Sequence, residues 1–179
     1  MTVATTLRRV DEYSESERQQ LAELRTAVYP PDEAAKWPGS AREWARPAWG
    51  VLVTDSKLGL TSYTGIVIRE ATHDGVGVHI GGIGGVATHP DSRRRGFAAA
   101  GIGRAVDFLL EQGVLFALLV CEQALIPYYR SLGWRVFAGT VLDEQRGVTE
   151  VFTFNEVMVL DVNGPAPESG TIDLRGPPW

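Results

Sequence analysis

The stretch GIGGVATHPDSRRRGFA, residues 82–98, decides the fold. Its first part belongs to an extended apolar run over residues 76–88, in which four of the five glycines cluster at positions 81, 82, 84 and 85. Glycine weakens a strand interior and marks a bulge or a close approach of another backbone. Pro90 ends the run, and the three arginines at 93–95 lead into a helix predicted over residues 93–112. The sequence therefore predicts a bulged strand, a cationic turn and a helix in direct succession.

The arginine turn has the chemistry of an anion site. A helix N-terminus presents unsatisfied N–H groups and the positive end of the helix dipole. The small residues Gly96 and Ala98 leave room for a phosphate, and arginine offers forked donors that match phosphate oxygens. The alternative is a solvated basic turn that begins an ordinary helix. The nearby GIGGVA stretch matches a dinucleotide-binding pattern, but the strand continues to Thr88 before any helix begins, which excludes that interpretation.

The remaining patterns predict a mixed sheet covered by helices, an α/β (α+β) fold of one domain over residues 1–162. Residues 163–179 form a Pro/Gly-rich tail with little regular structure, and its final Trp179 is predicted to pack against the domain. Helices are expected at 14–28, near 40–45, at 93–112 and at 122–132. Strands are expected at 4–10, 49–55, 58–71, 76–88 and 114–121, and a closing pair at 134–138 and 148–162.

Composition excludes several classes of protein. The chain has 17 Lys plus Arg against 22 Asp plus Glu, a net charge of −5, so we expect no nucleic-acid partner. No apolar run approaches the ~20 residues of a membrane span, and we expect no membrane partner. The single cysteine, Cys121, excludes an intrachain disulfide and fits a reducing, cytoplasmic location. The three histidines lack metal-ligand spacing, so no metal site is expected.

Over roughly residues 49–138, the order of motifs resembles the GNAT superfamily of acyl-CoA-dependent N-acetyltransferases. The resemblance rests on the strand ending GVATHP (85–90), the arginine turn, the following helix, the apolar strand at 114–121 and the segment IPYYRSLGW (126–134). It implies a mostly antiparallel central sheet, acetyl-CoA as co-substrate, and a bulged strand whose backbone pairs with the pantetheine arm. The cofactor-binding residues that it implies are Val86, Ala87, Thr88, Arg93, Arg94, Arg95, Gly96, Phe97 and Ala98.

The resemblance also assigns the catalytic groups. Tyr129 occupies the position of the family's general acid, and the backbone amide of Val86 is placed to stabilise the oxyanion. With reference pKa values of ~8.5 for a thiol and ~10 for tyrosine, the free energy of proton transfer from tyrosine to the departing thiolate is within ~2 kcal/mol of zero. The alternative role for Tyr129 is that of an ordinary core aromatic.

Three further features are the YRSLGW ending at 129–134, the strand around 151–160 followed by Asp161, and a tail that closes with DLRG (173–176) and Trp179. With them, the chain looks most like the aminoglycoside 2′-N-acetyltransferases within the superfamily, and its tail is expected near the acceptor site. A weaker likeness is to the acetyltransferase domain of Eis-type proteins.

The likeness to the aminoglycoside 2′-N-acetyltransferases implies a small polycationic amine as acceptor, held by Asp32, Asp173 and the terminal Trp179, and an acidic protein would attract such a molecule. A homodimer is left open.

One position departs from the family pattern. Gly84 stands where the family places a carboxylate that serves as general base. His79, Glu122 or a water chain would then have to accept the proton of the amine. The departure keeps two further functions open: a degenerate GNAT domain that binds acyl-CoA or another ligand without turnover, and a peptide N-acetyltransferase.

Overall fold

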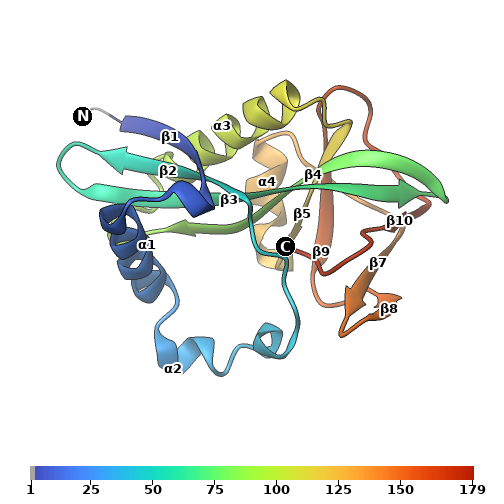
Figure 1. Cartoon of the computed structure of the whole chain (residues 1–179), viewed down its shortest axis with the longest axis horizontal. Helices are drawn as coiled ribbons and strands as arrows, with labels where there is room; N and C mark the ends of the chain where they lie inside the picture. The colour runs from blue at the N-terminus through green and yellow to red at the C-terminus, as the bar shows by residue number, and fades with distance from the viewer. Residues whose placement is uncertain (1–2) are drawn as a thin grey trace. The chain divides into compact units, whose positions relative to one another are not determined.

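The computed structural model describes residues 3–179, so the first two residues of the predicted domain 1–162 lie outside the described residues. It has the predicted mixed α/β architecture, with a mostly antiparallel sheet and flanking helices (Figure 1). The described chain divides into two compact units. Unit 1 comprises the described residues up to Ala41, Pro47–Ile66 and Ile83–Asp107, and unit 2 comprises Arg42–Arg46, Val67–Gly82 and Phe108–Trp179.

Unit 1 holds the N-terminal strands and helices. In chain order they are β1 (Val3–Arg9), α1 (Glu15–Val28), α2 (Pro31–Ala34), β2 (Trp49–Asp55), the first part of β3 (Gly59–His73), the last part of β4 (Val76–Thr88) and the beginning of α3 (Phe97–Glu111). β1 pairs antiparallel with β2, and β2 pairs antiparallel with β3. Ser14 begins α1 through a capping box with Glu17, as its position before an acidic first turn predicts. Leu21 and Leu24 of α1 are buried in the apolar cluster of this unit.

Unit 2 holds the C-terminal half of the sheet. Its further elements are β5 (Phe116–Cys121), α4 (Ile126–Ser131), β6 (Arg135–Val136), β7 (Thr140–Gln145), β8 (Val148–Val151), β9 (Glu156–Asp161) and β10 (Thr171–Asp173). The strand order is β6-β9-β5-β4-β3-β10-β7-β8. β5 runs parallel to β4, and β10 runs parallel to β7.

Local turn chemistry fixes several of these boundaries as predicted. β2 and β4 have the bounds that the sequence indicates. Asp74 and Gly75, both with positive φ, make the tight turn between β3 and β4, as an Asp-Gly pair favours. Gly113 and Gly133 also have positive φ, and they end α3 and α4.

Four predictions were wrong in detail. α3 begins at Phe97 rather than Arg93, because Arg94 and Gly96 adopt left-handed φ angles that no helix accepts. The short helix expected near 40–45 is a 3₁₀ turn at Pro38–Ala41. Residues 148–162 form two strands, β8 and β9, rather than one; β6 pairs with β9, and β8 pairs with an unpredicted strand, β7. The tail, predicted to have little regular structure, contains β10, whereas the burial of Trp179, at 5% exposed, agrees with its predicted packing.

Candidate active site

The last part of β4 is held by side chains and backbone of β3. The Ser62 hydroxyl donates to the Ala87 carbonyl at 2.8 Å and shares a hydrogen bond with the Thr88 hydroxyl at 2.9 Å. The His89 amide donates to the Thr61 carbonyl at 2.9 Å. Gly85 is exposed and has a left-handed φ inside the strand, which breaks the regular pleat as the predicted bulge requires. The backbone from Gly85 to His89 is therefore fixed by its neighbour within unit 1.

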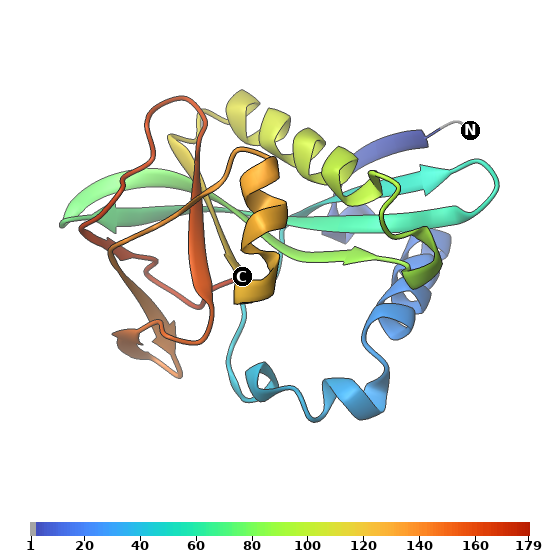
Figure 2. The ribbon, with the colours of Figure 1, turned by 180° about the vertical axis from the view of Figure 1, so that it is seen from behind.

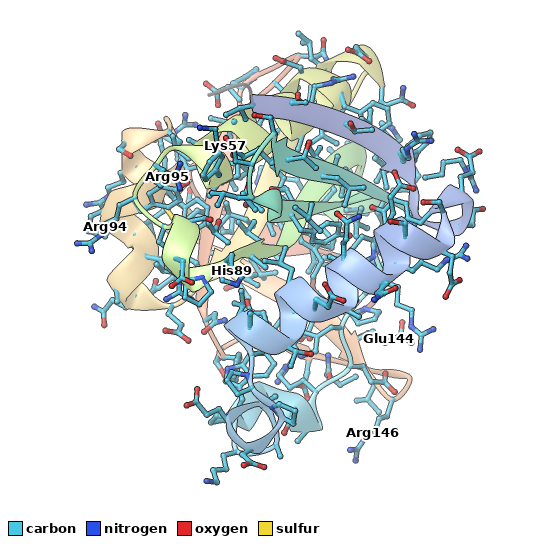
Figure 3. All side chains as sticks on the ribbon, turned by 90° about the vertical axis from the view of Figure 1, so that its left-hand side faces the viewer. Lys57, His89, Arg94, Arg95, Glu144 and Arg146 are labelled. Carbon is cyan, nitrogen blue, oxygen red and sulfur yellow. The ribbon has the colours of Figure 1, made fainter. Side chains whose placement is uncertain are left out.

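The turn after β4 presents three exposed arginines ahead of α3. Arg94 and Gly96 both adopt left-handed φ angles ahead of the helix, and Figure 2 shows the turn that leads into α3. Arg94 projects away from the ribbon (Figure 3), and the Arg93 side chain donates from Nε to the Thr88 carbonyl at 3.4 Å. A Cβ atom at Gly96 would meet no atom within 4 Å. The turn thus combines open space, cationic side chains and the first-turn amides of a 15-residue helix.

Tyr129 lies in unit 2, on α4, and is 7% exposed. Its ring packs edge-on against Tyr128 and Trp134, at centroid distances of 5.2 and 6.4 Å. The Tyr129 carbonyl accepts hydrogen bonds from the amides of Leu132 and Trp134, and these bonds end α4. Tyr128 points outward and is 36% exposed, and partial burial raises the pKa of its phenol. Packing therefore fixes Tyr129 far more tightly than its neighbour.

Comparison with known proteins identifies the family. The model of the acetyltransferase (GNAT) domain matches residues 9–137, which include the bulged strand, the arginine turn and α4. The chain belongs to the GNAT domain family. It is accordingly an acyltransferase, and the resemblance predicted from residues 85–134 is confirmed at the level of the superfamily.

Solved GNAT structures share the fold at low sequence identity. The E. coli GNAT family N-acetyltransferase YhbS, solved in complex with CoA, is 17% identical with a TM-score of 0.62, over 98% of this chain and 92% of that one. E. coli ElaA is 16% identical with a TM-score of 0.63, over 89% and 100%. A GNAT family acetyltransferase from Brucella melitensis, in complex with acetyl-CoA, is 12% identical with a TM-score of 0.57, over 94% of each chain. A comparison with curated protein sequences finds no match.

The two candidate bases of this GNAT domain lie in unit 2. His79 is on β4, and its Nδ1 lies 2.5 Å from the Glu70 carboxylate on β3. This contact at the protein surface gives His79 a structural partner besides its predicted role. Glu122 is exposed and directly follows β5, ahead of α4. Gly84, where the family places its carboxylate, is a buried position of β4.

The predicted acceptor residues fall in both units. Asp32 is exposed in the first turn of α2, in unit 1. Asp173 ends β10 in unit 2, and its carboxylate accepts the Arg175 amide at 2.8 Å. The buried Trp179 indole belongs to the core of unit 2. Asp32 therefore belongs to unit 1, whereas Asp173 and Trp179 belong to unit 2.

Sequence reasoning missed two arginines that organise unit 2. Arg69 on β3 donates to the carbonyls of Leu174 and Pro177, and its guanidinium lies over the Trp179 ring. Burial lowers the pKa of Arg69. Arg42 contacts a carboxylate on β7 that is more than 100 positions away in sequence. No local signal could have revealed contacts at this separation.

Cys121 is buried, as predicted, and its thiol lies 3.8 Å from the Met158 sulfur. Burial raises the pKa of this thiol to about 11, so it stays protonated at neutral pH. Among residues 3–179, no set of three or more His, Cys, Asp or Glu side chains is arranged to hold a metal ion. Within the same residues, no helix has the length and apolar character needed to cross a membrane.

Proposed function

We propose that this protein is an acetyl-CoA-dependent N-acetyltransferase that moves an acetyl group to a primary amine of a small polycationic, aminoglycoside-like acceptor. One observation carries the proposal. The β4 end, broken by Gly85, leads through three exposed arginines into the N-terminus of α3, in a chain of the GNAT family. The CoA and acetyl-CoA complexes of two similar GNAT structures support the choice of cofactor.

The residues of unit 1 fit a bound CoA. The amides of Phe97 and Ala98 and the side chains of Arg93–Arg95 would hold its pyrophosphate, since they combine helix-terminal donors with positive charge. The open space beside Gly96 would let phosphate oxygens approach the backbone. The backbone of Val86, Ala87 and Thr88 would hold the pantetheine arm. When bound, acetyl-CoA supplies an acetyl group activated as a thioester.

The proposed chemistry is direct attack of the amine within a ternary complex. The Val86 amide stabilises negative charge on the thioester oxygen while the new C–N bond forms. The C–S bond would then break, the Tyr129 hydroxyl would give its proton to the departing sulfur, and the second proton of the attacking nitrogen would return to the Tyr129 oxygen as the amide forms. The attacking amine must first lose a proton, and His79, Glu122 or a water chain accepts it because Gly84 cannot.

Charge supports the choice of acceptor. The chain carries a net −5 although the arginine turn is cationic, so acidic residues outnumber basic ones in the rest of the chain, which favours a polycationic acceptor. We assign Asp32 and Asp173 as carboxylates that hold the acceptor, and the tail ending in Trp179 as the segment that shapes its site.

The test is release of free CoA thiol when the full chain meets acetyl-CoA and a panel of aminoglycosides, polyamines, amino acids and peptides. We expect turnover with aminoglycosides or polyamines. Turnover with peptides alone would overturn the small polycationic acceptor. His79→Ala and Glu122→Gln, compared by their pH–rate profiles, identify the base: loss of the limb that rises with pH marks the residue that supplies it.

A second function, acyl-CoA binding without turnover, is favoured by Gly84 in place of an acid. Calorimetry distinguishes the two. Tight acetyl-CoA binding with no thiol release across the panel would select the binding module and reject the enzyme.

A further inference from the structure

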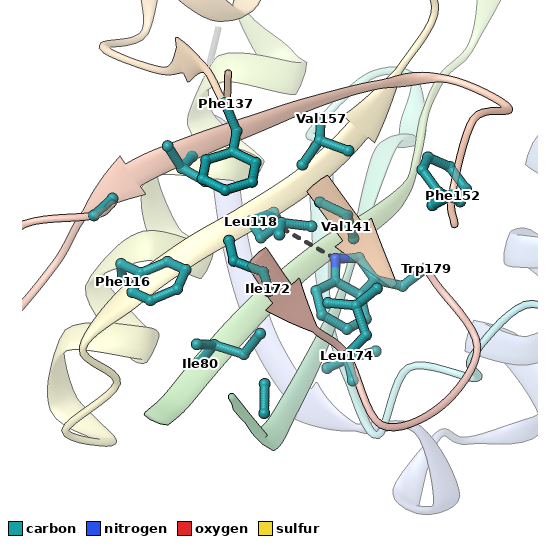
Figure 4. Close-up of a cluster of buried hydrophobic side chains, with 14 residues drawn as sticks. Ile80, Phe116, Leu118, Phe137, Val141, Phe152, Val157, Ile172, Leu174 and Trp179 are labelled. Carbon is teal, nitrogen blue, oxygen red and sulfur yellow. Dashed lines mark hydrogen bonds between the residues drawn. The ribbon is translucent and has the colours of Figure 1, made fainter. Parts of the chain in front are cut away.

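The indole of Trp179 lies where β4 and β5 stop pairing. The parallel pairing of these strands covers Ile80–Gly82 on β4 and Phe116–Leu118 on β5. At its last pair, Gly82 with Leu118, the Trp179 Nε1–H donates to the Leu118 carbonyl at 3.0 Å (Figure 4). The same ring covers the face of Gly82, where any Cβ atom would overlap it. The Trp179 indole therefore contacts both strands at the last residue pair of their ladder.

Contacts from two other segments hold this indole in place. The guanidinium of Arg69 lies 5.3 Å from the ring centroid and donates to the carbonyls of Leu174 and Pro177 at 3.2 and 2.8 Å. The Ala45 amide donates to the Pro178 carbonyl at 2.6 Å. A buried ring fixed from both sides has a defined position rather than being a loose surface anchor.

The hydrogen bond to Leu118 has a structural consequence. A strand carbonyl with no partner recruits an amide from the neighbouring strand, because an unpaired buried acceptor is costly. The indole N–H satisfies the Leu118 carbonyl at the point where the ladder would otherwise continue. Its ring also needs Gly82 to lack a side chain, which explains one glycine of the glycine-rich strand.

We propose that Trp179, held by Arg69, is a positioning residue that ends the β4–β5 ladder at Gly82 and Leu118 and so keeps the following β4 backbone free to bind the acyl-thioester arm of the cofactor. This inference rests on the proposed function and assigns to the tail a role in cofactor binding. The role belongs to the indole ring and its N–H group.

The first test is Trp179→Phe, which keeps an aromatic ring and removes the N–H donor. We expect calorimetry to show acetyl-CoA binding about tenfold weaker, the scale of one lost hydrogen bond. Trp134→Phe is the matched control, since Trp134 is equally buried in the same unit and its Nε1 has no hydrogen-bond partner among the described residues. Its acetyl-CoA affinity should stay within about twofold of the wild type.

Arg69→Gln tests the same inference while leaving the indole itself intact. It removes the guanidinium that lies over the Trp179 ring and donates to the carbonyls of Leu174 and Pro177. We expect the affinity for acetyl-CoA to fall, as in Trp179→Phe. If Trp179→Phe does not fold, the acetyl-CoA affinity of Arg69→Gln still tests the positioning role.

Gly82→Ala tests the contact from the strand side. The added methyl group would displace the indole in the wild type but fits the space vacated in Trp179→Ala. The substitution should therefore lower the urea midpoint strongly in the wild type and much less in the Trp179→Ala background.

The outcomes separate this inference from the proposed function. If the wild type fails to bind acetyl-CoA, the proposed function falls and this inference falls with it. If the wild type binds and both Trp179→Phe and Arg69→Gln bind equally well, the positioning role is wrong while the proposed function stands. Equal effects of Gly82→Ala in both backgrounds would also overturn it.

Discussion

Arg42 and Asp143 form an ion pair of 2.7 Å in which the aspartate side chain is 0% exposed. Arg42 also contacts Glu150 at 3.0 Å and lies over the Phe152 ring, and Gln145 donates to the same Asp143 oxygen. These contacts join the segment Arg42–Arg46 to the hairpin of β7 and β8 within unit 2. A charge this deeply buried is tolerated only because its partner is beside it.

Breaking this pair should destabilise the protein strongly. We expect Arg42→Gln to cost about 3–5 kcal/mol in the free energy of unfolding, because Asp143 would remain buried without its counterion. Urea denaturation measures the change. Arg135→Gln is the control, since the Arg135–Asp161 pair is exposed and should contribute at most about 1 kcal/mol. Equal losses in the two variants would contradict a special role for burial.

Tyr129→Phe should lower kcat by about a hundredfold and leave the KM for acetyl-CoA nearly unchanged, because only the proton donor is lost and the packed ring remains. The effect should grow at alkaline pH, where solvent is a poorer proton donor. Steady-state thiol release measures it. Tyr128→Phe, which changes the neighbouring outward-facing ring, should keep activity within about twofold. Similar losses in both variants would remove Tyr129 from the mechanism.

Gly96→Ala should raise the KM for acetyl-CoA about fivefold. Gly96 has a left-handed φ. Alanine in that conformation is strained by about 1 kcal/mol, and relief of the strain would rotate the first-turn amides away from the phosphates. An unchanged KM in Gly96→Ala would argue against a phosphate site at the turn.

Gly103→Ala provides the contrast within the same helix. Gly103 is an exposed helical position with open space around it. Alanine there should stabilise the fold by about 0.5–1 kcal/mol without changing cofactor binding.

The capping box of α1 makes stability depend on pH. Hydrogen bonds from the Ser14 backbone lower the pKa of Glu17 below its usual 4.5, so the folded state favours the ionised carboxylate. Its contribution is present above pH 4.5 and is lost as the pH falls through the lowered folded-state pKa. The stability difference between wild type and Glu17→Gln, from urea curves at several pH values, should therefore shrink below pH 4.5. A difference that stays constant from pH 7 to pH 3 would contradict this assignment.

Ser14→Ala should cost about 1 kcal/mol in the free energy of unfolding, since it removes the acceptor of the Glu17 amide. Ser16→Ala, in the first turn of the same helix, lacks this capping role and should change stability by less than about 0.5 kcal/mol. Urea denaturation at pH 7 compares the two, and equal losses would show that the cap contributes nothing.

The sequence by itself determined the elements whose ends are set by local chemistry. Pro90 ends β4, Asp74 and Gly75 turn the β3–β4 hairpin, and Gly113 closes α3, because each residue dictates its own backbone angles. The order of motifs over residues 85–134 also indicated the family, because the glycines and arginines of these motifs lie close together in sequence and can be read without the structure. The aminoglycoside-like acceptor stays a prediction.

Only the tertiary structure decided β7 and the position of the tail. Asp143 occupies an inward position of β7, and a charged residue there hides the alternation that marks a strand until Arg42, 101 residues away, is seen to neutralise it. Trp179 and Leu118 are 61 residues apart, and nothing in a Pro/Gly-rich tail indicates which carbonyl its last side chain will reach. Local backbone preferences are written in neighbouring residues, whereas a buried ion pair and a docked indole exist only once distant segments have packed together.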